Sequence, residues 1–352
     1  AVEGMESGHI WIDTSTTDYH NTKYIASVAA GKGIFSLEAP VSNLSHMGVD
    51  FANVSFYVGG DQAGYDIVEE IFNTMGKISF YVGDIGVAQT VKLLTNLLFY
   101  TAMVVLGEVL IIAKTTGIPL AWMWDFIKAS KGNSFVTEQV APFIFDGSYD
   151  SSCTLEITVK DTDLTVKLAD ELNVPLPLGR IIEERYRQAG VKYKAHDNHV
   201  IVTQLIEEEN NLDLRLPGFV APSKYGANPN YIRPEEYVED KYGRIKPWPY
   251  QQNYQPPTAK LKESLTEIAQ SLTDFMAYVN YVSLQEAYML GEKMGLQKKL
   301  LKEVVKWSCG TSWVFDNEDS FSPDRSILKK IKAYHFSEKA RIATVEKILS
   351  VL

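Results

Sequence analysis

The sequence predicts an α/β region followed by all-helical regions. Three observations predict this fold class: short apolar segments alternate with helical ones over residues 1–85, the pattern turns helical over residues 86–207, and helical periodicity returns over residues 259–352. Alternating strands and helices are typical of a largely parallel sheet with both faces covered. With 352 residues, the chain is long enough for two or three domains.

The first region contains four predicted strands, at residues 9–13, 33–37, 54–58 and 78–82. Helices are predicted at residues 18–30 and 61–75, the second capped by Asp61. Polar turns follow the first two strands. Since loops at the carboxyl ends of strands commonly carry sites in open α/β sheets, Ser15, Thr16 and Ser42 are candidate binding residues. The plainer alternatives are helix capping for Ser15 and Thr16 and a turn serine for Ser42.

The longest predicted helix covers residues 89–116 and is apolar almost all round. Glu108 interrupts its most apolar stretch and Gly117-Ile118-Pro119 ends it, so we expect a buried core helix rather than a membrane span. Lys92 and Asn96 are four residues apart and share one face of this helix. Further helices are predicted near residues 121–130, 134–143, 157–172 and 177–189.

The last helical region repeats part of the earlier one. Between them, residues 208–258 hold most of the prolines and many Tyr and Asn residues, which predicts an ordered arm that packs onto the rest. Chance agreement of two helical stretches is the alternative to a repeat, but the shared glycine spacing favours a duplicated bundle. Residues 284–314 match residues 106–136 at an offset of 178, with the pairs Glu108/Glu286, Gly117/Gly295, Gly132/Gly310, Ser134/Ser312 and Val136/Val314.

Composition limits the classes of partner. The net charge of −10 argues against nucleic acid, because phosphates need a basic surface. Two cysteines, Cys153 and Cys309, cannot form a disulfide framework, so we expect a reducing, cytoplasmic setting. His196 and His199 have a spacing at which they could share a metal. No Cys or carboxylate cluster accompanies them in the sequence, so we expect a solvated loop and no metal.

Four segments occur in an order typical of one protein family, and four in the right order are specific although each alone is weak. Over about residues 4–200, the chain resembles the β-hydroxyacid dehydrogenases, the family of 3-hydroxyisobutyrate dehydrogenase. The matching segments are residues 13–16 (DxST), 39–42 and 58–60 (APVSGG and VGG), Gly83, Gly86, Gln89, Lys92 and Asn96 (the element that carries the family's catalytic lysine), and Lys160-Asp161 (KD).

The resemblance implies a nicotinamide cofactor, NAD or NADP, and a small 3-hydroxy acid or its aldehyde or keto partner as substrate. It implies that Lys92 is the general acid in reduction and the general base in oxidation, with Asn96 orienting it or the substrate. A partly desolvated ammonium suits this role because burial disfavours its charged form. The plain alternatives are a surface lysine with a helix asparagine, and an exposed ion pair at residues 160–161. The other implied contacts are Ser42, Asn43 and Leu44 for the substrate and Ser15, Thr16, Lys160 and Asp161 for the cofactor.

The sequence also departs from the family pattern. The SGG element is Ser42-Asn43-Leu44, one extra residue precedes Gly59, Tyr19 stands where a proline is usual, and Ala88 replaces a common glycine. The sequence has no GxGxxG turn, which would hold a pyrophosphate at a helix N-terminus. We therefore expect an incomplete Rossmann-type domain, with the chain forming part of a longer protein; a separate partner carrying the missing half is the alternative.

The second bundle repeats packing residues but not chemical ones. The offset partners of Lys92, Asn96 and Lys160 are Gln270, Asp274 and Glu338, so a structural bundle is predicted. By resemblance to long 6-phosphogluconate dehydrogenases, it takes over packing that shorter relatives obtain from a second subunit, and a homo-oligomer stays open. The rival readings are a non-catalytic subunit or scaffold, favoured by the missing glycine-rich turn and the arm, and an imine reductase of the same broad fold, which Lys92 disfavours.

Overall fold

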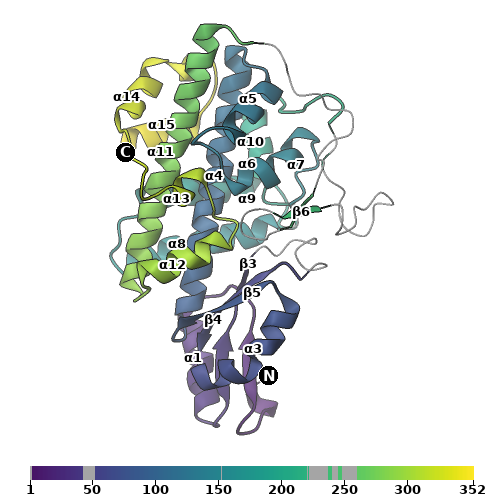
Figure 1. Cartoon of the computed structure of the whole chain (residues 1–352), viewed down its shortest axis with the longest axis vertical. Coiled ribbons are helices and arrows are strands. Elements are labelled where there is room, and N and C mark those ends of the chain that lie inside the picture. Colours follow the sequence, from purple (N-terminus) through teal and green to yellow (C-terminus); the bar gives the residue numbers. More distant parts are fainter. Residues whose placement is uncertain are drawn as a thin grey trace.

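The computed structural model describes residues 2–42, 52–151, 153–219, 221 and 260–352, and the backbone of two short strands at residues 237–239 and 245–247. An open sheet with two helices forms one end of the molecule, and long helices form the rest (Figure 1). Asn43, Leu44 and most of the predicted arm lie outside the described residues. The two arm strands, β6 (Tyr237–Glu239) and β7 (Ile245–Pro247), pair antiparallel.

The sheet contains the four predicted strands and one that sequence patterning missed, β3, which is only two residues long. Helix α1 (Tyr19–Ala30) connects β1 to β2, and α3 (Gln62–Met75) connects β4 to β5; both strand pairs are parallel, as crossover helices require. The strands are β1 (Ile10–Asp13), β2 (Phe35–Glu38), β3 (Val41–Ser42), β4 (Ser55–Gly60) and β5 (Ile78–Gly83).

The expectation of a largely parallel sheet is wrong, because the sheet is mixed. In the order β1-β2-β4-β3, with β5 also beside β4, both β2 and β3 run antiparallel to β4. Hydrophobic patterning shows that a segment is a strand but not which way its neighbour runs. Asp61 is the N-cap residue of α3, as predicted, but its side chain caps no helical N–H; its carboxylate accepts a hydrogen bond from the backbone N–H of Ser36 at 2.7 Å.

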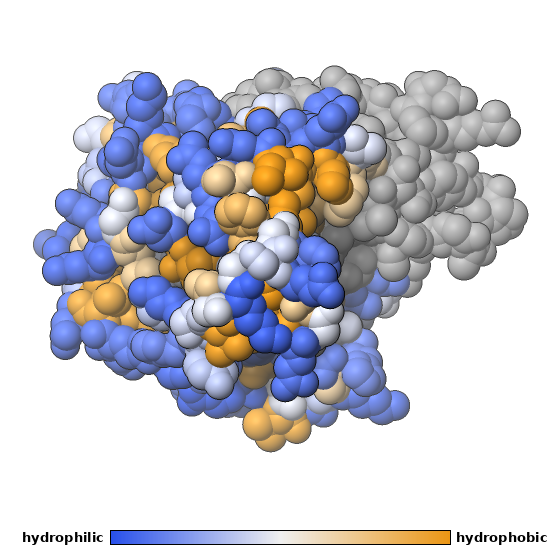
Figure 2. Space-filling view, turned by 90° about the horizontal axis from the view of Figure 1, so that it is seen from below, coloured by the Kyte–Doolittle hydropathy of each residue, from blue (hydrophilic) through white to orange (hydrophobic). Residues whose placement is uncertain are grey.

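The exposed faces of α1 and α3 lie at the sheet end of the molecule. Figure 2 looks onto this end, where hydrophobic side chains are interspersed with polar ones. On α3, the exposed Ile67, Ile71 and Met75 recur every four residues, while Val68 and Phe72 pack into the core. On α1, Tyr24 and Val28 are exposed.

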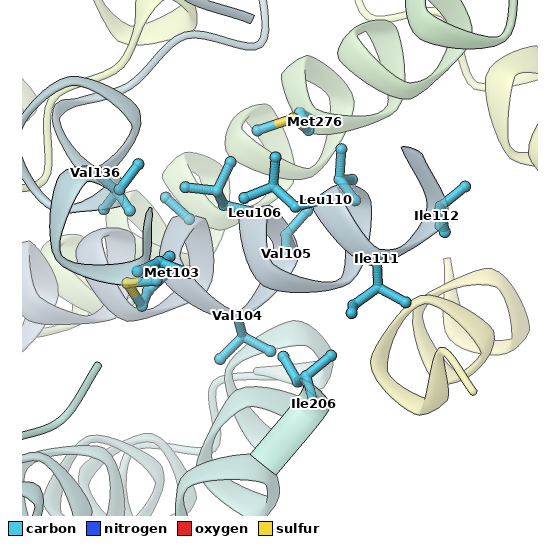
Figure 3. Packing of buried hydrophobic residues seen from close by; sticks show 14 of the residues in the cluster. Met103, Val104, Val105, Leu106, Leu110, Ile111, Ile112, Val136, Ile206 and Met276 are labelled. Carbon is cyan, nitrogen blue, oxygen red and sulfur yellow. The ribbon is translucent and has the colours of Figure 1, made fainter. Parts of the chain in front are cut away.

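Helix α4 (Val87–Thr116) is the predicted core helix, and Gly117 ends it in the left-handed conformation. Its most apolar 18-residue stretch is long and hydrophobic enough to span a membrane, yet 94% of that stretch is buried inside the protein. Along α4, Met103 lies near Val136, Leu106 and Leu110 lie near Met276, and Val104, on the other side, lies near Ile206 (Figure 3). The helix is therefore the axis of the hydrophobic core.

The remaining helices surround α4. The predicted helix at residues 134–143 is interrupted at Val140 and forms two short helices, because Pro142 lacks the N–H that a continuous helix needs. The helices are α5 (Leu120–Lys128), α6 (Phe135–Gln139), α7 (Ala141–Phe145), α8 (Leu155–Glu171), α9 (Pro177–Lys192), α10 (Ile201–Glu209), α11 (Glu263–Lys293), α12 (Lys298–Lys306), α13 (Trp313–Asp316), α14 (Ser326–Ala333) and α15 (Ala343–Val351), with 3-10 turns at Val2–Gly4 and Phe336–Glu338.

Helices α4 and α11 lie side by side and contact each other (Figure 1). Ser134 and Ser312, which are 178 residues apart, form an antiparallel bridge. The N–H of Phe135 donates to the carbonyl of Thr311 at 2.9 Å, and the N–H of Trp313 donates to that of Asn133 at 2.8 Å. These two bonds are also related by the offset of 178.

Two buried glutamates at equivalent positions cap helices of the opposite region. The Glu108 carboxylate accepts hydrogen bonds from the N–H groups of Thr344 (2.8 Å) and Val345 (2.7 Å), at the start of α15. The Glu286 carboxylate accepts those of Leu178 (2.8 Å) and Gly179 (2.9 Å), at the start of α9. Each helical region therefore satisfies orphan N–H groups of the other.

Candidate active site

A buried carboxylate connects the sheet to the first turn of α4. Glu38, the last residue of β2, is fully buried, and its Oε1 accepts the N–H groups of Gly86 and Ala88 at 2.7 Å and of Gln89 at 3.4 Å. Burial raises the pKa of Glu38 to about 7, and this effect exceeds the opposing effect of the three N–H donors. Glu38 was not predicted as a site residue from the sequence. The one feature that could have indicated it is the presence of a charged residue at the end of an apolar strand.

The turn after β1 is held between α4 and α8. The Gln89 side chain accepts the N–H of Thr17 at 3.0 Å and donates to the carbonyl of Ser15 at 2.9 Å. The Lys160 ammonium donates to the carbonyl of Thr16. Helix capping does not explain Ser15 and Thr16, because Asp18 is the residue whose side chain caps α1. The structure thus brings Ser15, Thr16 and Lys160 together.

The KD element forms a partly buried network with α4. The Asn96 amide donates to Asp161 Oδ2 at 2.8 Å, and the Lys160 ammonium lies 3.0 Å from Asp161 Oδ1. The side chain of Asp161 is 1% exposed and that of Lys160 is 42% exposed, so the alternative of an exposed ion pair is wrong. Burial raises the pKa of Asp161, while the positive charges of Lys160 and Lys92 partly oppose this increase.

Lys92 lies half-buried one turn before Asn96, close enough for its charge to act on both Asp161 and Cys153. Its ammonium favours the ionised forms of these two groups, although burial raises the pKa of the Cys153 thiol overall. Lys92 is thus neither fully exposed nor fully buried, while Asn96 is buried. The direct contact of Asn96 is with Asp161, whose carboxylate also interacts electrostatically with Lys160 and Lys92.

Ser42 is fully buried and contacts the second helical region. Its Oγ lies 4.0 Å from the Sγ of Cys309, in the turn between α12 and α13. Cys153, before α8, lies within electrostatic range of Cys309. Sequence reasoning placed no thiol near the site. The only available signal was that Cys309 lies in the same turn as the glycine and serine of the repeat.

The two histidines of the HxxH pattern occupy different environments. His196 is exposed and lies 3.0 Å from Glu156. His199 is buried against Phe99 and Tyr100, and burial lowers its pKa to about 3. The prediction of a solvated loop is therefore wrong for His199. Within the described part of the chain, no group of three His, Cys, Asp or Glu side chains is arranged to hold a metal.

The described residues fit the nicotinamide part of a dinucleotide better than its pyrophosphate part. The side chains of Gln89, at the start of α4, and Lys160, which is 42% exposed, donate to the carbonyl groups of Ser15 and Thr16. This contact lies at the carboxyl end of the parallel pair β1 and β2, where open α/β sheets bind their ligands. Ser15, Thr16 and Lys160 would hold the nicotinamide side. The glycine-rich turn that binds a pyrophosphate does not occur in the sequence.

Comparisons with known proteins agree with this geometry. Residues 1–83 match the family model described as the NAD binding domain of 6-phosphogluconate dehydrogenase, and residues 86–206 match the NAD-binding domain of NADP-dependent 3-hydroxyisobutyrate dehydrogenase. The chain is 30% identical over 178 residues to 2-(hydroxymethyl)glutarate dehydrogenase of Eubacterium barkeri, covering 50% of this chain and 59% of that protein. It is 29% identical over 188 residues to the cytokine-like nuclear factor N-PAC of Homo sapiens, covering 53% of this chain and 34% of that protein.

A solved structure extends the similarity of fold to nearly the whole chain. The 6-phosphogluconate dehydrogenase of Plasmodium falciparum superimposes with a TM-score of 0.63 at 16% identity, over 99% of this chain and 73% of that one. The two sequence relatives are matched over less than two thirds of their own lengths. Through its residues 1–206, the chain belongs to the β-hydroxyacid dehydrogenase family, with a Rossmann-like fold that binds NAD or NADP and a helical C-terminal region.

Proposed function

We propose that the chain carries the catalytic part of an NAD(P)-dependent dehydrogenase that acts on a short 3-hydroxy acid or its carbonyl partner. The observation that carries this proposal is the half-buried Lys92, beside the buried Asn96–Asp161 pair and close to the turn that Gln89 and Lys160 hold. When bound, the nicotinamide supplies a hydride acceptor or donor at its C4 atom. The protein supplies position, electrostatics and a proton acceptor.

In oxidation, the substrate C–H hydrogen leaves with its electron pair as hydride, and the hydroxyl proton moves to the neutral amine of Lys92. In reduction, the ammonium of Lys92 returns that proton to the carbonyl oxygen. Asp161 lies close to Lys92 and accepts a hydrogen bond from Asn96, so we assign both as positioning residues. Ser42, with Asn43 and Leu44, would bind the substrate carboxylate.

Replacing Lys92 by alanine tests this proposal. In the full natural protein, Lys92→Ala should lower kcat by roughly 10²- to 10⁴-fold, the usual contribution of a general acid or base. Binding of the reduced cofactor, followed by its fluorescence, should remain. Lys114→Ala is the matched control, since Lys114 lies near the other end of α4 and contacts Asp213. Near-normal turnover in the Lys92 variant would refute the assignment.

A non-catalytic role is the second candidate, and the relation to the N-PAC proteins favours it. The departure from SGG at residues 42–44 points the same way, because it changes the substrate-binding element. A cofactor titration combined with a turnover assay on the intact chain separates the two candidates. Binding without turnover on any short hydroxy acid would favour the non-catalytic role.

We further propose that the second helical bundle arose by duplication of the first and supplies packing that shorter relatives obtain from a second subunit. The symmetric bonds at Ser134 and Ser312 and the reciprocal caps of Glu108 and Glu286 support this proposal. A protein that is monomeric in solution by sedimentation would agree with it, and a dimer that buries α11 would contradict it.

A further inference from the structure

The turn between α12 and α13, residues 307–312, reaches from the second helical region to the sheet. The carbonyl of Trp307 accepts a hydrogen bond from Ser55 Oγ at 3.0 Å, at the start of β4. Two residues later, Cys309 Sγ lies 4.0 Å from Ser42 Oγ, in β3. In Figure 1, α12 lies just above the sheet end of α4. The turn therefore meets the sheet at the strand that carries the proposed substrate-binding serine.

Close packing fixes the position of this turn. A Cβ atom on Gly310 would lie 2.9 Å from the carbonyl oxygen of Thr95 and 3.0 Å from the side chain of Leu98, so only glycine lets the turn rest on α4. Thr95 lies between Lys92 and Asn96 along the same helix. The packing therefore holds Cys309 next to the part of α4 that carries the proposed chemistry.

The equivalent turn of the first helical region, around Gly132, makes the same backbone contacts but has a different side chain at the position of Cys309. A Cβ on Gly132 would lie 2.9 Å from the carbonyl of Thr273, the offset partner of Thr95. Lys131, the offset partner of Cys309, is exposed to solvent. The second region thus places a half-buried thiol against Ser42 where the first places a charged residue in water.

A second thiol, Cys153, lies within electrostatic range of Cys309 and Lys92. The interaction of Cys153 with both groups agrees with the packing of residues 307–312 against the part of α4 between Lys92 and Asn96. Residues 307–312 have the sequence Trp-Ser-Cys-Gly-Thr-Ser, which contains no charge. A wall of this composition fits an uncharged substituent, because a phosphate or a second carboxylate against it would lose hydration without gaining a cation from this turn.

We infer that Cys309 is a specificity-determining residue that contacts the substituent on the substrate carbon next to the carboxylate, so that the second helical bundle forms one wall of the substrate site. The inference rests on the proposed dehydrogenase function. It predicts a preference for a short, uncharged alkyl substituent over larger alkyl groups and over phosphorylated hydroxy acids.

The selectivity test uses the full natural protein and a series of 3-hydroxypropanoates with methyl, propyl or butyl groups at C2. Cys309→Ala should raise the ratio of kcat/KM for the butyl to the methyl compound at least fivefold, because it removes the sulfur that limits the site. Cys309→Ser, which nearly keeps the side-chain volume, should keep the ratio within twofold of the natural protein. Lys131→Ala is the matched control at the equivalent turn and should leave the ratio unchanged.

A second measurement does not depend on any variant folding. The rate of alkylation of Cys309 by iodoacetamide, read at the peptide level by mass spectrometry, should fall at least fivefold when 2-methyl-3-hydroxypropanoate is present at saturation with the cofactor. An unchanged selectivity ratio in Cys309→Ala, or an alkylation rate that the hydroxy acid does not alter, would overturn the inference while Lys92-dependent turnover persists. Absence of turnover on every hydroxy acid, with or without Lys92, would instead refute the proposed function.

Discussion

The carboxyl of Glu38 should make the stability of the protein depend on pH in a direction opposite to that of a paired surface carboxylate. Burial raises its pKa from 4.5 to about 7, so the folded chain keeps a proton that the unfolded chain releases between these values. The stabilisation is complete below pH 4.5 and is lost as the pH rises through 7. The gap between the two pKa values corresponds to about 3 kcal/mol of unfolding free energy.

Comparison with Glu38→Gln isolates this effect. Glutamine keeps an oxygen that can accept the N–H groups of Gly86 and Ala88, but it does not ionise. Between pH 4.5 and 8, the unfolding free energy of the natural protein should therefore fall by about 3 kcal/mol relative to that of the variant. Glu38→Ala should cost about 3 kcal/mol or more at pH 4.5, since it leaves three buried N–H groups without their acceptor. This cost should shrink as the pH rises to 8, because alanine does not ionise and only the natural protein is destabilised.

Urea denaturation at several pH values, followed by tryptophan fluorescence, measures these differences. A difference between the natural protein and Glu38→Gln that stays constant from pH 4.5 to 8 would refute the reasoning. It would mean that the carboxyl keeps an ordinary pKa in the folded protein and that its burial is relieved by water.

Two further predictions concern the contacts between the helical regions. Glu108→Ala and Glu286→Ala should each lower the unfolding free energy by about 2–5 kcal/mol, because each leaves two buried N–H groups unpaired; equal midpoints of urea unfolding for variant and natural protein would contradict this. Gly310→Ala should lower the Tm in a thermal melt by several degrees, since its Cβ would lie 2.9 Å from a backbone oxygen of α4. Gly117 has open space around it and a left-handed backbone, so Gly117→Ala measures the cost of that backbone conformation alone.

The strands and the core helix follow from local patterns in the sequence, whereas the grouping of Ser15, Thr16 and Lys160 is implied by the resemblance to the dehydrogenase family. Apolar periodicity identifies individual strands and helices because it depends only on residues close together in the chain. The order of the family motifs indicates the fold because it fixes the order in which strands and helices are connected. The antiparallel direction of β4 relative to β2 depends on how distant segments pair, which periodicity does not record. Contacts between residues far apart in the chain are hidden for the same reason.

The missed site residues illustrate this limit. Cys309 lies 267 residues after Ser42, and no spacing rule connects them. Glu38 could be read as the polar end of a strand, and only the fold shows that α4 directs its first N–H groups at the carboxylate. His199 resembles a loop histidine in sequence, yet the surrounding aromatic rings make it a core residue.

The reciprocal glutamate caps also constrain the order of events when the chain is synthesised. Helix α9 obtains its acceptor from Glu286, 107 residues beyond Gly179, and α15 obtains its acceptor from Glu108, 237 residues before Val345. When the first helical region leaves the ribosome, the N–H groups at the start of α9 therefore lack their acceptor until Glu286 has been synthesised. Closing such long loops is entropically costly and slow, so the two regions should reach their final packing together, late in folding.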